Sequence, residues 1–187
     1  MKYTVLCTVA AMAASAHAGN FFSESENNDT IAMANDLGTF DAPGGNLVLD
    51  GELGTSDVDW FSFTLDNDAS LSFFSIFSAA GADGLMQIVA TGGDVIAFDD
   101  DSGVGLMPSI QIENLAAGTY YIGISGFGDV DSSSVGTDEL ADGRLDTGEG
   151  HGESFAYKLN VGFSIVPAPG ATALLGMGGL MITRRRR

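Results

Sequence analysis

Cysteine is almost absent from this sequence. The single cysteine is Cys7, which lies in an apolar segment at the N-terminus. A chain with no cysteine beyond that segment forms no disulfide, binds no zinc through thiolates and has no cysteine nucleophile. The folded body therefore depends for its stability on buried apolar surface, on backbone hydrogen bonds and on any metal ion that it binds.

Basic residues are also scarce, and their position matters more than their number. The chain has 7 basic and 25 acidic residues, but only Arg144 and Lys158 are basic between residues 19 and 165. With two basic against 25 acidic residues, that segment has a net charge of −23. Such a surface repels nucleic acid and anionic lipid, and it attracts divalent cations or cationic partners. Solubility in salt is the plainer alternative.

Histidine offers little for catalysis. Beyond the N-terminal segment the chain has one histidine, His151, in a glycine-rich acidic stretch where no pattern indicates a held imidazole. A Ser/His/Asp triad needs an oriented imidazole, and a zinc site needs more histidine or cysteine. We therefore expect a protein that is not an enzyme. Carboxylate pairs are abundant, so composition leaves a glycoside hydrolase open as the alternative.

Residues 1–18 predict a secretory signal peptide. A short positive start is followed by a mostly apolar run from Thr4 to Ala14. The sequence Ala16-His17-Ala18 then places small residues at the two positions that signal peptidase reads. We expect cleavage after Ala18 and export of the chain that follows.

Residues 166–187 predict a second targeting signal. A proline-containing break precedes a short apolar stretch and a basic end. The break contains Val166, Pro167, Pro169 and Gly170, and the basic end consists of Arg184, Arg185, Arg186 and Arg187. A helix over residues 170–183 would be about 21 Å long, which is short of the ~30 Å hydrocarbon core of a membrane. These lengths favour a transient membrane stop with the arginines on the cytoplasmic side.

This tail resembles the PEP-CTERM sorting signal, although Ala168 stands where that family has glutamate. The resemblance implies that an exosortase, which is a membrane protease, processes the tail. It also implies delivery of the body to the cell envelope, the cell surface or the extracellular matrix. On this hypothesis the partners are signal peptidase and an exosortase-like protease, and the tail makes the only membrane contact.

Between these ends, short alternating runs separated by turns predict strands. Apolar side chains alternate most clearly from Ser154 to Ile165. Residues 85–90 and 95–98 predict a hairpin around Thr91-Gly92-Gly93-Asp94. About eight or nine strands with almost no helical pattern predict an all-β fold, an antiparallel, jelly-roll-like β-sandwich over residues 19–165. A short apolar helix is expected in the tail.

Two segments fall outside this strand pattern. Asn28 and Asp29 precede an alanine-rich run, which predicts a capped turn that leads into one short helical turn. The stretch from Gly126 to Glu153 is acidic and rich in glycine and shows no period. A loop of that length is usually functional or disordered.

The segment from Asp57 to Leu65 is the strand around which we expect the others to pack. Phe61 and Phe63 alternate with Trp60 and Ser62, so the phenylalanines face the core. We expect Trp60 to be packed as well, which leaves Tyr121 as the better exposed aromatic side chain for stacking on a sugar.

Four short motifs follow one another between residues 24 and 122. They are Glu24-Ser25-Glu26-Asn27-Asn28-Asp29, Asp57-Val58-Asp59-Trp60-Phe61-Ser62-Phe63, Asp99-Asp100-Asp101-Ser102-Gly103 and Ala117-Gly118-Thr119-Tyr120-Tyr121-Ile122. As a set they resemble the bacterial pre-peptidase C-terminal domain. The resemblance implies a β-sandwich of the kind usually appended to secreted proteases. In function the nearest analogy is the related collagen-binding module of bacterial collagenases, which binds calcium through an acidic N-terminal segment.

The resemblance implies a calcium site. Its ligands would be Glu24, Glu26, Asn28 and Asp29, which match the pattern of the collagen-binding relatives, together with Asp57 and Asp59. Calcium prefers six to eight oxygen ligands at roughly 2.3–2.6 Å. The alternative is that Asn28 and Asp29 cap a turn and the glutamates are solvated.

A second metal site is conceivable at Asp99, Asp100 and Asp101. A tight acidic turn that ends in Ser-Gly is, however, more typical of plain turn chemistry.

These observations favour an exported, non-enzymatic module at the cell surface or in the matrix that binds Ca²⁺. Polysaccharide and protein are candidate further ligands, and nucleic acid is not expected. The alternative is a secreted hydrolase that acts on glycans through an Asp/Glu pair, and a third hypothesis is a passive surface protein. A cleft with two facing carboxylates and aromatic side chains would favour the enzyme.

Overall fold

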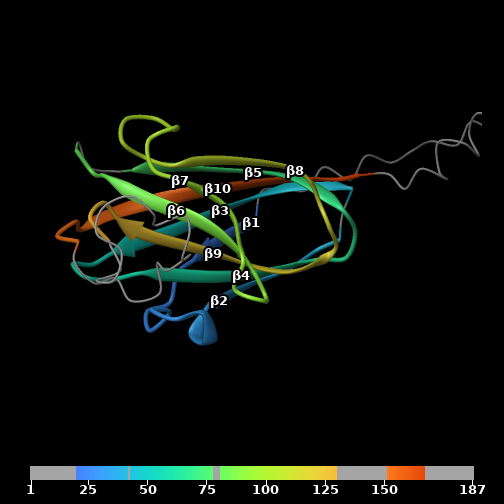
Figure 1. Cartoon of the computed structure of the whole chain (residues 1–187), viewed down its shortest axis with the longest axis horizontal. Coiled ribbons are helices and arrows are strands. Elements are labelled where there is room, and N and C mark those ends of the chain that lie inside the picture. The colour runs from blue at the N-terminus through green and yellow to red at the C-terminus, as the bar shows by residue number, and fades with distance from the viewer. Residues whose placement is uncertain (1–19, 42, 78–80, 130–150, 167–187) are drawn as a thin grey trace, which may run out of the picture.

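The computed structural model describes residues 20–41, 43–77, 81–129 and 151–166, which form two five-stranded sheets (Figure 1). Sheet A has the strand order β1-β3-β10-β5-β8, and sheet B has the order β2-β4-β9-β6-β7. The predicted signal peptide, the sorting tail from residue 167 onward and most of the long acidic loop lie outside the described residues.

The strand bounds are as follows. Sheet A contains β1 (Asn20–Ser23), β3 (Gly44–Leu53), β10 (Phe155–Ile165), β5 (Ala69–Phe77) and β8 (Ser109–Leu115). Sheet B contains β2 (Asn35–Phe40), β4 (Asp59–Leu65), β9 (Gly118–Gly126), β6 (Gly84–Ala90) and β7 (Val95–Asp99). A 3₁₀ turn, η1 (Ile31–Met33), lies between β1 and β2. Within the described ranges, no helix has the length and apolar character needed to cross a membrane.

The all-β sandwich is confirmed, but it differs from the expectation in two respects. The described residues form ten strands instead of eight or nine. The sandwich is also not purely antiparallel, because β1 pairs with β3 and β2 pairs with β4 in parallel. Both extra strands come from residues 20–40, where β2 contains Gly38 at a φ of 84° and its register shifts. That irregularity hides the alternation by which a strand is recognised in sequence.

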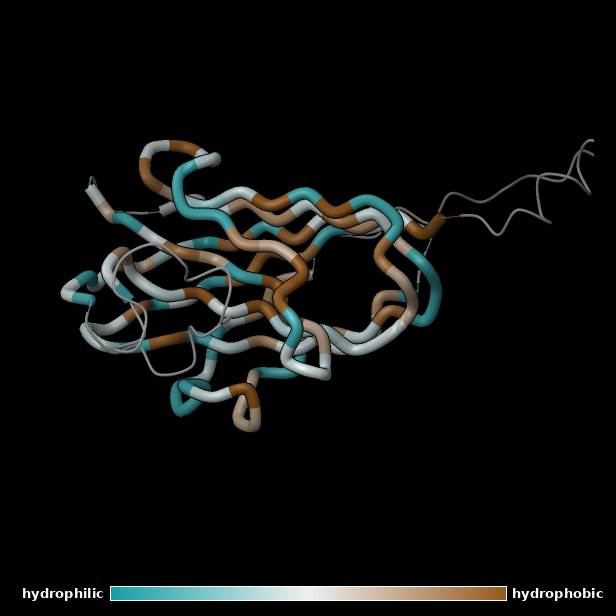
Figure 2. Tube along the Cα trace, viewed as in Figure 1, coloured by the Kyte–Doolittle hydropathy of each residue, from teal (hydrophilic) through white to brown (hydrophobic). Residues whose placement is uncertain are grey.

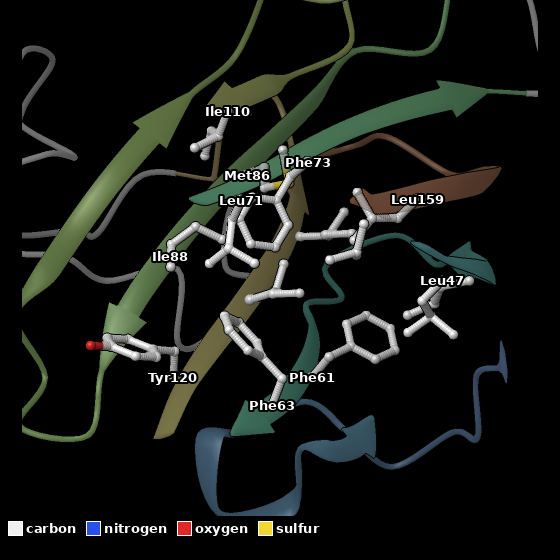
Figure 3. Close-up of a cluster of buried hydrophobic side chains, with 14 of the residues drawn as sticks. Leu47, Phe61, Phe63, Leu71, Phe73, Met86, Ile88, Ile110, Tyr120 and Leu159 are labelled. Carbon is white, nitrogen blue, oxygen red and sulfur yellow. The ribbon is translucent and has the colours of Figure 1, made fainter. Parts of the chain in front are cut away.

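The core fills the space between the two sheets. Phe61 and Phe63 of β4 are fully buried, as their alternation predicts. The Phe63 ring lies 5.3 Å from the Phe40 ring, 5.7 Å from the Tyr120 ring and 6.0 Å from the Phe73 ring, centroid to centroid. Figure 3 shows side chains of both sheets pointing toward one another in this cluster. Figure 2 shows apolar and polar residues alternating along parts of the strands.

A smaller apolar cluster lies on the other face of sheet B. Trp60 is fully buried there, although it points away from the main core. Gly123 lies opposite Trp60 in β9, and a Cβ atom at Gly123 would stand 2.9 Å from the indole ring. Ile31 and Ala34 pack against this cluster. The backbone N–H of Trp60 donates to the backbone carbonyl of Asn28 at 3.0 Å. The N-terminal segment, defined here as residues 24–34, therefore covers this face of sheet B.

At one end of the core, Gly51 leaves space for the side chain of Tyr157. Gly51 of β3 lies opposite Tyr157 of β10, and a Cβ atom added to Gly51 would overlap the Tyr157 ring. Tyr157 is buried, so its ring cannot move aside into solvent.

We predict that Gly51→Ala lowers the free energy of unfolding by about 1–3 kcal/mol, because an overpacked core must shift backbone or side chains. Urea or thermal unfolding measures this loss. Gly152→Ala is the matched control, since an added Cβ there meets nothing within 4 Å. Equal stabilities of the two variants would contradict the placement of Tyr157 over Gly51.

Candidate metal centre

Asp59 begins strand β4 and is fully buried between the sheets. It faces the core like Phe61 and Phe63. Its Oδ2 accepts a hydrogen bond of 2.7 Å from the hydroxyl of Tyr157, which belongs to sheet A. No N–H or O–H group of the described residues donates to its other oxygen, Oδ1. The sequence places Asp59 at the mouth of the strand, whereas the structure places it at the closed end of the core.

Glu24 reaches this carboxyl group from the N-terminal segment. Its N–H donates to the Asp50 carbonyl at 2.9 Å, and its Oε2 accepts a bond of 2.7 Å from the N–H of Glu52. Its Oε1 accepts a bond of 2.9 Å from the side-chain amide of Asn28. These contacts fix Glu24 against β3, beside Asp59.

Asn28 is fully buried and completes the group. Its backbone carbonyl binds the N–H of Trp60, the residue after Asp59. Its side-chain nitrogen is bound to Glu24, whereas no described N–H or O–H group donates to its Oδ1. Two buried oxygens, Asn28 Oδ1 and Asp59 Oδ1, are thus left without a donor in one small group.

The electrostatics of this group are dominated by burial, and like charge adds to its effect. Burial raises the pKa of Asp59 to about 10, and a hydrogen bond between the carboxyl groups of Asp59 and Glu24 and the charges of Glu24 and Asp57 contribute to the rise, against the opposing effect of the Tyr157 hydroxyl. Desolvation opposes the charged form of a carboxyl group, and a second carboxylate adds repulsion. Without a cation, Asp59 is therefore held in its neutral, protonated form.

The neighbouring carboxylates also affect Glu26, which lies beside this group. Desolvation by burial, together with the charges of Glu24, Asp57 and Asp29, raises the pKa of Glu26, although this side chain is exposed. A shallow hollow of about 360 Å³ lies beside Glu24 and Glu26. It is lined by carboxylates and contains no aromatic side chain.

The structure brings together three of the six expected ligands, Glu24, Asn28 and Asp59. Asp57 also caps a turn, since its Oδ2 accepts a bond of 2.8 Å from the N–H of Gly54. Glu26 and Asp29 lie exposed on the N-terminal segment. As they stand, no three His, Cys, Asp or Glu side chains in the described part of the chain form a metal-binding group. The group therefore offers two carboxylates and one amide oxygen.

Residues 99–101 behave as a turn. Asp99 Oδ2 accepts bonds from the N–H groups of Ser102 at 3.0 Å and Ser109 at 2.7 Å. Asp100 Oδ1 accepts a bond of 2.8 Å from the N–H of Asp101. These carboxylates connect the turn to the start of β8, which is the turn chemistry that Asp-rich segments commonly provide.

The sequence shows no pattern that would hold the imidazole of His151 in place, but the structure shows that this ring is held. Its ring is buried, and its Nε2 lies 2.7 Å from the carbonyl oxygen of Asp57 and 3.1 Å from the Asp57 nitrogen. The ring fills the space beside Gly126, where a Cβ would stand 2.6 Å from Nδ1. Sequence reasoning missed this contact because its partner is 94 positions away and no local pattern marks it.

This histidine does not complete a catalytic relay. The Ser125 hydroxyl donates to Asp129 Oδ2 at 2.6 Å and not to the imidazole, and all three side chains are buried. The aromatic side chains considered for sugar stacking are also engaged: Trp60 is buried, and Tyr121 is partly buried against the Trp60 cluster.

Residues 57–126 match the family model of the bacterial pre-peptidase C-terminal domain. The match covers β4 to β9 and includes Asp57 and Asp59, whereas the N-terminal segment lies before it. No curated protein matches the chain in sequence.

Several solved structures are remotely similar. PliG of Aeromonas hydrophila, a periplasmic inhibitor of g-type lysozyme, is 14% identical with a TM-score of 0.46, over 79% of this chain and 100% of PliG. The pre-peptidase C-terminal domain of a Bacillus anthracis collagenase is 16% identical with a TM-score of 0.43, over 68% of this chain and 93% of that domain. CorA of Methylomicrobium album, a surface-associated copper-binding protein, is 12% identical with a TM-score of 0.36, over 71% and 100% of the two chains.

The raised pKa of Asp59 generates a prediction about pH. Its folded-state pKa of about 10 lies above the ordinary value of 3.8, so the folded state binds the proton more tightly than the unfolded state does. With chelator present, the stability that this proton provides is complete below pH 4 and is lost as the pH rises toward 10. Asp59→Asn should therefore stabilise the metal-free protein, and its advantage over the wild type should grow across this window.

Urea unfolding at a series of pH values, with chelator, measures this difference. Asp66→Asn is the control, because it removes the same charge from an exposed turn and should change stability by less than about 0.5 kcal/mol. A wild-type advantage over Asp59→Asn that increases with pH would rule out a neutral, buried Asp59.

Proposed function

We propose that the protein is an exported, non-enzymatic β-sandwich module whose N-terminal segment is fastened to the sandwich by Ca²⁺. The observation that carries this proposal is the pair of buried oxygens, Asn28 Oδ1 and Asp59 Oδ1, that receive no described hydrogen bond. A buried acceptor without a partner costs about 1–3 kcal/mol. A cation bound between these oxygens and Glu24 removes that cost, and it takes the place of the proton that Asp59 otherwise holds.

The donor set fits calcium better than a transition metal. Glu24, Asn28 and Asp59 supply carboxylate and amide oxygens, and calcium accepts such oxygens together with backbone carbonyls and water. The charges of Asp29 and Asp57 act on Glu26, and that of Asp57 acts on Asp59. Glu26, Asp29 and Asp57 are therefore the expected additional ligands. Zinc and copper favour nitrogen and sulfur ligands, which this group does not contain.

Calcium at this position would act as a fastener. The N-terminal segment carries Glu24 and Asn28 and covers Trp60, whereas Asp59 belongs to β4. A cation shared between them joins the segment to sheet B. Because binding occurs only in the folded state, it adds directly to the free energy of unfolding. This suits an exported body without cysteine.

Two observations favour a binding module over the hydrolase alternative. The acidic hollow beside Glu24 lacks the aromatic side chains that a glycan-cleaving cleft uses. Ser125, Asp129 and His151 are buried and are not hydrogen-bonded as a relay. The match of residues 57–126 to the pre-peptidase C-terminal family supports the same conclusion.

We predict that calcium raises the melting temperature of the protein by several degrees. At 100 times its dissociation constant, a specific ligand adds about 2.7 kcal/mol to the free energy of unfolding. Thermal unfolding with calcium and with chelator measures the shift, and calorimetry of the folded protein measures the binding heat. Magnesium should give a smaller effect, because it requires a tighter octahedral set of ligands.

Matched variants locate the ion. Asn28→Ala and Asp59→Asn should abolish the calcium shift, whereas Asn67→Ala and Asp66→Asn, on an exposed turn, should keep it. A shift that survives in Asp59→Asn would show that the ion binds elsewhere. The absence of any shift in the wild type would leave the acidity as a property of the surface alone.

We also propose that residues 166–187 are a processed sorting signal. In a bacterium that contains an exosortase, the surface-released protein should have lost its arginine end, and in a strain without the protease the tail should remain. Mass spectrometry of the C-terminal peptide distinguishes these forms, with Pro167→Ala/Pro169→Ala as the variant that impairs processing. Identical C-termini in both strains would disprove this role.

A further inference from the structure

The outer face of sheet A has a character of its own. The N-terminal segment packs on the outer face of sheet B, whereas two phenylalanines on the outer face of sheet A are exposed to solvent. Phe21 of β1 is 80% exposed and Phe74 of β5 is 39% exposed. Their neighbours Phe22 and Phe73 face the core, so both exposed rings belong to the same outer face by strand alternation.

Strand register places these two rings in one row. Phe21 lies opposite Val48, Val48 opposite Asn160, and Asn160 opposite Phe74. Three steps between neighbouring strands separate the positions of Phe21 and Phe74 by about 14 Å. The row therefore has an aromatic ring near each end, with the apolar side chain of Val48 and the amide of Asn160 between them.

The next row along the strands forms a hollow. It contains Asn46, Gly162, Ser72 and Gln111 in register across four strands. Gly162 has no side chain, and a Cβ there would stand 2.7 Å from Ser72 Oγ. A shallow hollow of about 480 Å³ lies over this position.

The chemistry of this face is unusual for so acidic a body. Most of its central outward side chains are uncharged: Val48 is apolar, and hydroxyls and amides stand at Asn46, Ser70, Ser72, Gln111, Asn160 and Ser164. The charged side chains flank this centre: Asp50, which is paired with Lys158, lies in the row on the other side of Phe21 and Phe74, and Glu113 lines one side of the hollow. A cationic partner would find stronger attraction elsewhere on the protein.

We propose that this outer face of sheet A binds an extended, neutral polysaccharide. Sugar rings have flat C–H faces that pack on aromatic rings, and their hydroxyls pair with amides and hydroxyls such as those of Asn160 and Gln111. Two aromatic positions about 14 Å apart, with Val48 and the amide of Asn160 between them and the polar hollow alongside, match a ligand that has apolar and polar surfaces along its length. A protein interface instead favours a continuous apolar centre, which this face does not have.

The inference rests on the proposed function in one respect. Phe21 lies on β1, and the chain continues from β1 directly to Glu24 at the calcium centre. Calcium therefore holds one end of the aromatic row in place, whereas Phe74, on β5 within the sheet, does not depend on it.

Affinity electrophoresis of the purified protein tests this proposal, with hydroxyethylcellulose and glucomannan as neutral probes and with alginate and gelatin as anionic and protein controls. We expect retardation by the neutral polysaccharides alone. Phe74→Ala should weaken binding about 2- to 10-fold, and Phe21→Ala/Phe74→Ala should remove it. Phe127→Ala is the matched control, since Phe127 is 58% exposed after β9 in sheet B and its loss should change nothing.

The other outcomes are equally informative. No retardation, or retardation unchanged in the double variant, overturns the proposal, and so does retardation by gelatin that the same substitutions remove. Asn160→Ala and Gln111→Ala provide a second test. Each should weaken retardation, because each removes an amide that pairs with sugar hydroxyls. With chelator, binding should fall to the level of Phe21→Ala. Polysaccharide binding that is unchanged by chelator would refute only the proposal that calcium fastens the N-terminal segment. A calcium-dependent shift in melting temperature without retardation would refute only the polysaccharide site.

Discussion

The buried carboxyl group of Asp59 is the constraint on which this structure depends. A carboxylate taken out of water must be protonated, paired or bound to a cation, and Asp59 has neither a basic partner nor full hydrogen bonding among the described residues. Its contacts reach both layers and the N-terminal segment, through Tyr157 and Glu24. The state of this one group therefore affects how the two sheets and the segment hold together.

The surroundings of Asp59 are arranged around that requirement. Because Gly51 has no side chain, the Tyr157 ring can lie against β3 at this position, and its hydroxyl donates a hydrogen bond to the carboxyl group of Asp59. His151, far away in the sequence, contacts the backbone of Asp57 just before the strand begins. Small residues and long-range polar contacts of this kind cost stability in an ordinary core. Their concentration at one end of the sandwich is consistent with a binding centre more than with a purely structural corner.

Local pattern was sufficient to predict eight of the ten strands in the described residues, and the resemblance named Glu24, Asn28 and Asp59, but neither predicted that Asp59 is buried. Alternation at Phe61 and Phe63 identified β4 and its buried face, and the apolar alternation of residues 155–165 identified β10, because burial on one face leaves a period of two. Residues 20–23 are too few to show a period, and Gly38 interrupts β2, so both parallel strands were missed. The burial of Asp59, the contact of His151 and the row from Phe21 to Phe74 depend on which distant strands are neighbours. That information is in the register and in no single segment.

The two outer faces of the sandwich show how these features combine. Sheet B carries Trp60 on its outer side, which is too large and apolar to be left in water, and the N-terminal segment covers it. Sheet A carries two exposed phenylalanines separated by Val48 and Asn160, beside a row of amides and hydroxyls, which tolerates water and also suits a ligand with apolar and polar surfaces. Strand β1 belongs to sheet A, while the segment that follows it is fastened to sheet B. A single chain segment thus connects the covered face to the open one, and an ion at Asp59 would set how firmly the open face keeps its edge strand.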